Sequence, residues 1–247
     1  LALLVLAHRL WIRRKGLNAL RDKLTGAVEP VPPGRILVHG VSLGEVQLMR
    51  PLVPRLERLA RRRCLLTTSS ETGAAALAAH FPDRERRPLP FDLPWATGRF
   101  LQRTRPALVV LLESELWPLL LLACHARGIP VVLVNARISE RSFAGYRRAG
   151  ALLRPLLRRV RLVLAQNALW GARLRALGVP RCAVTGSLKA DLVRPCTAAA
   201  RDEEARRLGL PVGPAHDKRV FLVASTSAAL GAFTSLIVQE KTAALPA

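Results

Sequence analysis

Short apolar runs of strand length recur along the chain, and four of them end directly in a polar cluster. These clusters are GVSLGE at residues 40–45, SSETG at 69–73, ESELWP at 113–118 and NARIS at 135–139. Helix-forming sequence follows the first three. Because a parallel α/β sheet binds its ligands beyond the carboxyl ends of its strands, the four clusters are expected to converge on one crevice.

The same pattern extends over most of the chain as strands alternating with amphipathic segments. Strands are predicted at residues 35–39, 64–68, 107–112, 130–134, 161–165 and 181–185, with a further extended piece ending at 88–94. Helices are predicted at the start of the chain and at residues 46–63, 72–80, 95–104, 118–127, 149–159 and 168–177. This alternation predicts an α/β fold with a Rossmann-like, doubly wound parallel sheet.

The amino end combines an apolar run, LALLVLA at residues 1–7, with the basic residues that follow it, from Arg9 to Lys15. Seven apolar residues are too few to cross a bilayer, which takes about 20 in a helix. The run could be the remnant of a longer membrane anchor, with the basic flank on the cytoplasmic side. It could equally be an amphipathic helix packed on the domain.

Charge changes the picture of possible partners. The formal net charge is +22 over 247 residues, and most of it comes from arginine, so the surface should attract anions such as phosphorylated lipids or an anionic membrane. Codon usage in a high-GC genome also explains much of an arginine excess. The basic residues are spread along the chain and only 4% of residues are aromatic, which argues against nucleic acid as a partner.

Cysteine and histidine give no sign of a metal centre. The four cysteines, Cys64, Cys124, Cys182 and Cys196, are dispersed, which indicates reduced thiols rather than a disulfide framework or a zinc site. His39 precedes the first polar cluster, where it could touch a ligand or make a structural hydrogen bond.

The GVSLGE cluster carries the first candidate for catalysis. Gly40 and Gly44 permit a tight turn and close approach of a ligand. Glu45, at the mouth of the crevice, could serve as a general base toward a hydroxyl. Ser42 and Glu45 also match the S-x-x-E capping box, and the local pattern alone favours that structural role.

The next two clusters add charged groups at the same edge. Glu113 and Glu115 follow a buried strand and could orient hydroxyls, although Glu115 also suits a helix start. Arg137 could clamp a phosphate or carboxylate, or form a salt bridge with one of the glutamates.

Six segments in order resemble the 3-deoxy-D-manno-octulosonic acid (Kdo) transferases of lipopolysaccharide assembly. They are HGVSLGEV (39–46), TTSSETG (67–73), PFDLP (90–94), ESELWP (113–118), NARISERS (135–142) and GSLKAD (186–191). The resemblance covers roughly residues 1–191. Ser187 and Ala190 depart from it, because the family usually has Asn and Phe there.

The resemblance implies a glycosyltransferase-B fold of two Rossmann-like domains. It implies an anchor remnant and basic linker at 1–30, an acceptor-binding domain at 31–195, and the start of a truncated or divergent donor-binding domain at 196–247. The last assignment follows from the run RVFLVASTS, after which the family's histidine and acidic residues are missing, so the chain is expected to be an incomplete copy.

The resemblance also implies a reaction. Kdo would pass from CMP-Kdo to the phosphorylated lipid A precursor with inversion, without cofactor or catalytic metal, at the cytoplasmic face of the bacterial inner membrane. By motif match, Glu45 is the expected base.

The other site residues take supporting roles in the same match. Ser42 and Gly44 would shape the turn that carries the base, and Glu113 and Glu115 would support the acceptor. Arg137 and Lys189 would bind anionic groups. Two alternatives stay open: another glycosyltransferase-B enzyme, or a non-catalytic, membrane-associated module that binds the acceptor.

Overall fold

A computed structural model of the chain describes residues 17–113, 116–192, 203 and 206–207. Contacts divide the chain into two compact units, Leu1–Val193 and Arg194–Ala247. The sheet, its helices and the candidate site all lie in the first unit. The apolar run at 1–7, Glu115 and almost all of the segment expected to begin a donor-binding domain lie outside the described residues.

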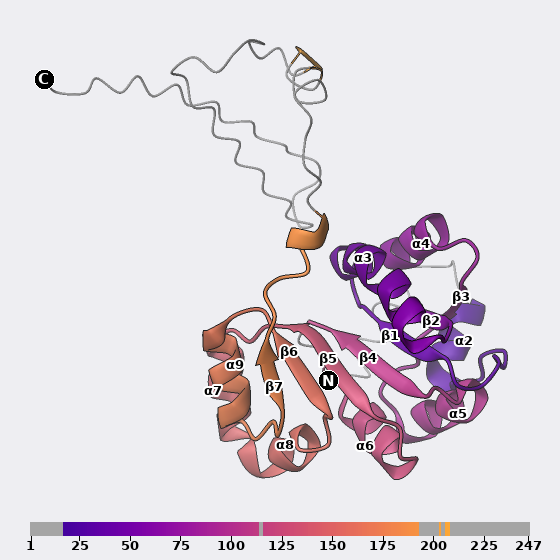
Figure 1. The fold of residues 1–247 in the computed structure, drawn as a ribbon. Helices are drawn as coiled ribbons and strands as arrows, with labels where there is room; N and C mark the ends of the chain where they lie inside the picture. The colour runs from indigo at the N-terminus through magenta and orange to yellow at the C-terminus, as the bar shows by residue number, and fades with distance from the viewer. Residues whose placement is uncertain (1–16, 114–115, 193–202, 204–205, 208–247) are drawn as a thin grey trace, which may run out of the picture. The chain divides into compact units, whose positions relative to one another are not determined.

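Seven parallel strands form one sheet in the order β3-β2-β1-β4-β5-β6-β7 (Figure 1). The strands are β1 (Ile36–His39), β2 (Cys64–Thr68), β3 (Glu85–Pro88), β4 (Leu108–Leu112), β5 (Val131–Ala136), β6 (Leu162–Ala165) and β7 (Cys182–Val184). The order reverses between β1 and β4, because the chain first winds outward to β3 and then crosses back. The predicted doubly wound parallel sheet is confirmed, and its topological switch point lies between β1 and β4.

Helices connect the strands in the expected alternation. They are α2 (Leu17–Thr25), α3 (Leu43–Ala60), α4 (Glu71–His80), α5 (Pro94–Thr104), α6 (Pro118–Ala126), α7 (Glu140–Arg148), α8 (Gly150–Leu157) and α9 (Ala168–Ala176), followed by a short 3-10 turn, η1 (Ala190–Leu192).

Most boundaries lie within one or two residues of the prediction, and two differences are larger. Helix α3 begins at Leu43 rather than at residue 46, so that Glu45 lies in its first turn. The connection from β5 to β6 contains two helices where one was predicted, because Ser139 accepts a hydrogen bond from the Ser142 N–H and starts α7 before α8 begins.

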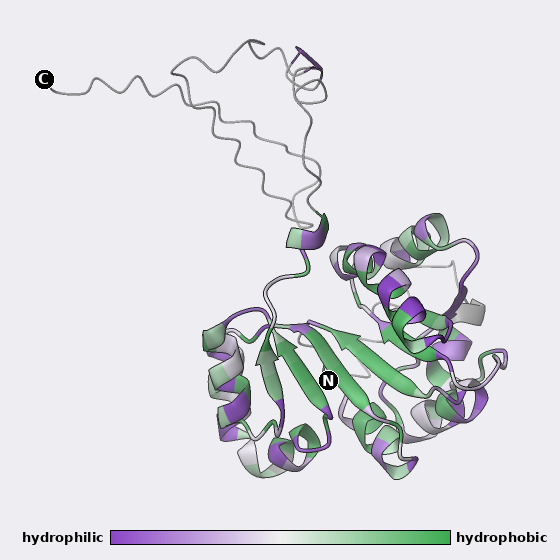
Figure 2. Cartoon of the chain, in the orientation of Figure 1, coloured by the Kyte–Doolittle hydropathy of each residue, from purple (hydrophilic) through white to green (hydrophobic). Residues whose placement is uncertain are grey.

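The sheet separates two apolar cores. Leu37, Leu65 and Val109 face one core, which extends under α5, α6 and α9. Ile36 and Val38, their neighbours in the pleat, face the other, beside α3 and α4. The central strands are therefore buried on both faces and read as continuous apolar runs rather than alternating ones, which is typical of parallel sheets (Figure 2).

The amino-terminal helix α2 is fastened to the loop that precedes α5. The Lys23 carbonyl accepts a 2.8 Å hydrogen bond from the Phe91 N–H, and the Trp95 indole donates to the Leu24 carbonyl at 3.0 Å. Across the described residues, no helix has both the length and the apolar character needed to cross a membrane. Among the described residues, Cys64, Cys124 and Cys182 form no disulfide.

Candidate functional site

Polar side chains collect at the carboxyl edge of the sheet, where the sequence pattern placed the crevice. The strand-end residues His39, Thr67, Glu113 and Asn135 are all buried, although each is polar or charged. They come from β1, β2, β4 and β5, the four central strands. Burying so many polar groups is costly unless they are paired, so their contacts decide what the edge can do.

Glu45 is held in the turn between β1 and α3. Ser42 is the N-cap of α3, and its Oγ accepts the Glu45 N–H at 3.3 Å. In return the Glu45 carboxylate accepts the Val41 N–H at 2.6 Å and the Ser42 hydroxyl at 3.1 Å. The geometry is a shifted capping box: Glu45 reaches the amide before the N-cap rather than that of the N-cap itself. The predicted cap is present, and it fixes the orientation of the carboxylate.

The pKa of the Glu45 carboxyl is raised, mainly because the residue is buried, with 7% of its surface exposed. The negative charge of Glu113 raises it further, while the hydrogen bonds from Val41 and Ser42 and the charge of Arg137 oppose the shift. A carboxyl with a raised pKa binds a proton more readily, which is the property that a general base requires.

The close packing of this turn depends on Gly40 more than on Gly44. A Cβ atom added at Gly40 would lie 2.9 Å from the Glu45 Cβ and 3.0 Å from the Met49 Cε. At Gly44, in contrast, an added Cβ would meet only the Ser42 Oγ, at an ordinary 3.8 Å. The glycine without which Glu45 could not occupy its position is therefore Gly40.

Glu113 and Arg137 form an ion pair across neighbouring strand ends. The Arg137 Nε lies 2.8 Å from the Glu113 Oε2. This is the salt bridge that the sequence offered as an alternative to an anion-binding role of Arg137. The two side chains are exposed to different extents, 12% for Glu113 and 54% for Arg137. The arginine thus keeps N–H groups free for an anion while it neutralises the buried glutamate.

Two strand ends adopt left-handed backbone conformations that glycine normally takes. Glu113 and Asn135 both have φ of 58°. Such a conformation costs energy for residues with a Cβ atom and is concentrated at functional sites. Glu113 directly follows the end of β4, whereas Asn135 lies one residue before the end of β5, where the pairing with β6 shifts its register.

Asn135 also ties the GSLKAD segment to the sheet. Its Oδ1 accepts the Leu188 N–H at 3.0 Å, whereas its Nδ2 is buried without a hydrogen-bond partner. Lys189 follows on this segment with an exposed side chain. The structure brings Ser42, Glu45, Glu113 and Arg137 together through hydrogen bonds, an ion pair and the interaction of their charges. Among the described residues, no hydrogen bond or ion pair connects the Lys189 side chain with this group.

His39 is buried and makes structural contacts within the protein. Its Nδ1 lies 2.9 Å from the Thr67 Oγ1, and its ring meets Trp117 edge to face at 5.5 Å between centroids. Burial lowers its pKa to about 3. The ring is therefore neutral at ordinary pH.

Lys23 of α2 reaches the same edge, which the sequence gave no reason to expect. Its Nζ donates to the Ser69 carbonyl at 2.9 Å, at the turn between β2 and α4. Burial lowers its pKa. A single lysine in an amphipathic helix carries no signal that separates it from an ordinary surface residue.

The sheet order and the polar side chains at the carboxyl edge fit one class of fold: this is a domain of the glycosyltransferase-B fold. Two solved structures share it. The S. aureus MnaA–UDP structure matches with a TM-score of 0.50 and 15% identity over 64% of this chain and 45% of that one. The UDP-GlcNAc 2-epimerase of Neisseria meningitidis bound to UDP-GlcNAc matches with a TM-score of 0.51 and 14% identity, over 71% and 54%. At such identities the likeness shows the fold alone.

Sequence comparison identifies the family. The family model of 3-deoxy-D-manno-octulosonic-acid transferase (kdotransferase) matches residues 9–192, and the chain belongs to this family. The 3-deoxy-D-manno-octulosonic acid transferase of Bordetella pertussis is 39% identical over 81% of the chain, and that of Haemophilus influenzae is 34% identical over 79%. These matches cover 47% and 45% of the relatives, so the chain spans about half their length.

Proposed function

We propose that this chain forms the acceptor-binding half of a glycosyltransferase of lipopolysaccharide biosynthesis, which moves Kdo from CMP-Kdo to the lipid A precursor. The observation that carries the proposal is the placement of Glu45. Its carboxylate is buried, oriented by two hydrogen bonds, raised in pKa, and adjacent to a second acid and an arginine at the crevice.

The chemistry follows from that placement. Each carboxylate oxygen of Glu45 accepts one hydrogen bond and keeps a lone pair, so an acceptor hydroxyl can still donate to it. As the hydroxyl oxygen attacks the anomeric carbon, its proton moves to Glu45 and the bond to CMP breaks with its electron pair leaving on the phosphate. Attack from the side opposite the leaving group inverts the anomeric centre. No step calls for a metal.

Arg137 would bind an anionic group of a substrate through the N–H groups that it does not use on Glu113. Lys189 would contribute a second positive charge from the segment after β7. The two residues suit a donor sugar with a carboxylate and an acceptor with phosphates.

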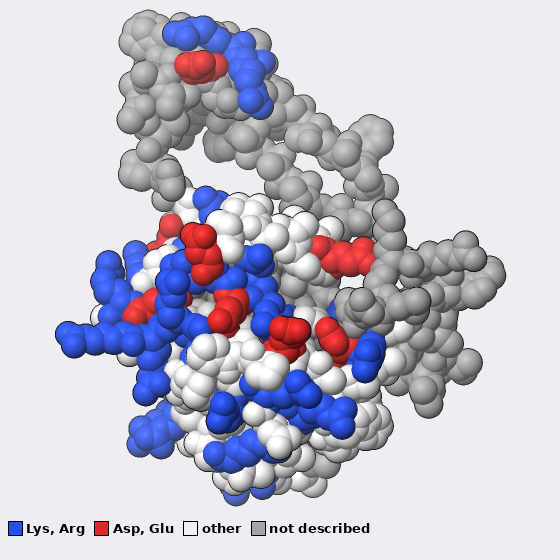
Figure 3. All heavy atoms as spheres, turned by 90° about the vertical axis from the view of Figure 1, so that its right-hand side faces the viewer, with Lys and Arg blue, Asp and Glu red and all other residues white. Residues whose placement is uncertain are grey.

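The basic surface supports a location at the cytoplasmic face of the inner membrane. Figure 3 shows lysine and arginine side chains over much of one face of the molecule, with fewer acidic side chains among them. Such a surface is attracted to anionic lipid headgroups, where the acceptor would also lie.

The experiment is Glu45→Gln in an enzyme that joins this chain to a donor-binding domain. We expect acceptor binding and the fold to persist while turnover falls by roughly 100-fold or more, the effect of a lost general base. CMP release and the mass of the lipid product report turnover. Glu29→Gln, an exposed glutamate outside the crevice, is the matched control. Full turnover in Glu45→Gln would leave Glu45 with only its capping role.

A further inference from the structure

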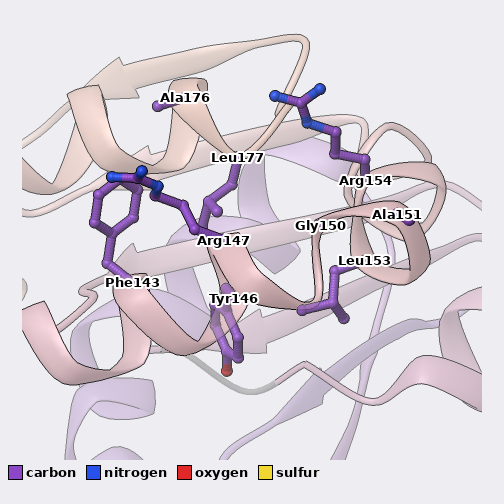
Figure 4. A pocket seen from close by; sticks show the side chains of 9 residues that line it. All are labelled: Phe143, Tyr146, Arg147, Gly150, Ala151, Leu153, Arg154, Ala176 and Leu177. Atoms are coloured by element: carbon purple, nitrogen blue, oxygen red, sulfur yellow. The ribbon is translucent and has the colours of Figure 1, made fainter.

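A second concave site lies between helices α7, α8 and α9, away from Glu45. It is a hollow of about 530 Å³, within the range of roughly 300–1,000 Å³ that small-molecule sites occupy. Its lining consists of Phe143, Tyr146, Arg147, Gly150, Ala151, Leu153, Arg154, Ala176 and Leu177. The hollow thus combines apolar side chains with two arginines (Figure 4).

The two arginines give the hollow a positive rim. Figure 4 shows Arg147 of α7 and Arg154 of α8 on either side of Leu177. Arg147 also lies over the Phe143 ring, 5.8 Å from its centroid. Both arginines are exposed, and within the part of the chain that the structure describes no carboxylate forms an ion pair with either of them.

The surrounding sequence does not neutralise this charge. Between residues 141 and 190 the chain contains ten arginines, one lysine and no acidic residue. Glu140, just before this stretch, is already paired with Arg173. A ligand of the hollow must therefore supply both negative charge for the rim and apolar surface for the floor.

We propose that this hollow binds one anionic phospholipid of the membrane. An acyl chain would pack on Phe143, Tyr146 and Leu177, and the phosphate would lie between the guanidinium groups of Arg147 and Arg154. A free phosphate would leave the apolar floor exposed to water, and a lipid without net charge would leave the arginine charges uncompensated. The site goes beyond the proposed transfer reaction, because neither Glu45 nor Glu113, Arg137 or Lys189 lines the hollow.

The hollow between α7, α8 and α9 and the candidate site share one neighbouring residue, Tyr146. Tyr146 also lines a narrower hollow that includes Glu113 and Arg137. A lipid bound between α7 and α9 would therefore hold the membrane surface beside the crevice.

The first test measures calorimetric binding of a short-chain phosphatidylglycerol at concentrations below micelle formation. We expect one molecule to bind per chain, with phosphatidylcholine of equal chain length and inorganic phosphate each about tenfold weaker or worse. The variant Arg147→Gln/Arg154→Gln should lose at least about tenfold in affinity. Arg148→Gln/Arg158→Gln removes the same charge from exposed positions of the same helical region outside the hollow and should have little effect.

The second test fills the hollow without removing charge. A Cβ atom added at Gly150 or at Gly145 meets no atom within 4 Å, so a larger side chain is tolerated at both. Gly150 lines the hollow and Gly145 does not. Gly150→Leu should therefore weaken lipid binding about tenfold or more, while Gly145→Leu should leave it unchanged.

Several results would overturn the proposal. Equal affinity for phosphatidylcholine would show that the net charge of the lipid does not contribute to binding. Equal affinity for inorganic phosphate would show that the acyl chain does not contribute. Equal losses in the two double-arginine variants would indicate a diffuse surface effect. Displacement of phosphatidylglycerol by the lipid A precursor at much lower concentration would assign the hollow to the acceptor instead. The calorimetric test contains no CMP-Kdo, so a failure to bind phosphatidylglycerol would not affect the proposed transfer reaction. Likewise, a loss of transfer in Glu45→Gln would not affect the proposed lipid site.

Discussion

At the scale of single residues, charged side chains of the candidate site influence the pKa of Glu45. Glu45 is raised in pKa first by burial and then by Glu113, while Arg137 opposes the shift and is itself paired with Glu113. Arg137 therefore limits how far burial and the charge of Glu113 disfavour ionisation of Glu45.

This arrangement predicts the effect of Glu113→Gln. The change removes the negative charge that raises the Glu45 pKa and keeps the positive charge of Arg137, which opposes that shift, so the Glu45 pKa should fall. Carbon NMR titration of labelled glutamate carboxyls measures it. Glu140→Gln, which removes an acid paired with Arg173 elsewhere, should not move the Glu45 titration. An unchanged Glu45 pKa in Glu113→Gln would mean that the two carboxylates do not interact.

His39 predicts a pH dependence of stability. The folded ring has a pKa of about 3, whereas the unfolded chain takes up the proton near the ordinary value of 6.5. The contribution of His39 to stability is therefore complete above pH 6.5 and is lost as pH falls toward 3, by up to about 1.4 kcal/mol per pH unit.

The measurement is the free energy of unfolding in denaturant between pH 7.5 and about 4.5. We expect His39→Asn to be less stable than the natural chain at pH 7.5, with a gap that narrows as the pH falls. A gap that stays constant with pH would show that His39 is protonated in the folded protein or is hydrated there.

At the scale of elements, Asp92 joins the loop before α5 to the start of α6. Its two carboxylate oxygens accept the Leu119 and Leu120 N–H groups at 2.9 and 2.8 Å, although Asp92 is 27 residues from the first of them. The N-cap position of α6 is Trp117, which makes no side-chain cap of its own. Asp92 therefore caps α6 from a distance.

We expect Asp92→Ala to lower the free energy of unfolding by about 1–2 kcal/mol, the upper part of the range for lost helix caps. Denaturant unfolding measures the change. Asp83→Ala is the control, because Asp83 is exposed on the loop before β3. If the free energy of unfolding fell equally in both variants, the hydrogen bonds from Asp92 to α6 would not explain the effect.

The elements that bury an apolar face could be predicted from the sequence. Of two elements that bury no residue, β7 was predicted and α7 was not. The central strands of the sheet and helices such as α3 and α5 show buried apolar positions at the expected spacing. Helix α7 has no buried residue, and its only apolar side chains are those of Phe143, Ala144 and Tyr146, so no apolar run marked it as an element. The clusters at the strand ends were found because parallel topology brings them together. The left-handed backbone of Glu113 was not, because a glutamate gives no indication of a positive φ.

At the scale of the whole molecule, the net charge of +22 predicts a salt-dependent attraction to membranes. Binding to vesicles with anionic lipids should weaken steeply as ionic strength rises, because the screening length shortens from roughly 10 Å at 0.1 M to 3 Å at 1 M. Vesicle sedimentation measures it. Neutral vesicles at low salt are the control, and equal binding to both would exclude electrostatic attraction as the cause.

The strand order also determines when the site can form during folding. Ile36 of β1 pairs with Cys64 on one side and with Leu108 on the other, so the centre of the sheet is closed by a strand that is made much later. Such non-local pairing slows folding. Glu45 precedes that crossover, whereas Glu113 and Arg137 follow it. A nascent chain ending at Thr104 would carry Glu45 but neither of its charged neighbours, with one edge of β1 unpaired and prone to association.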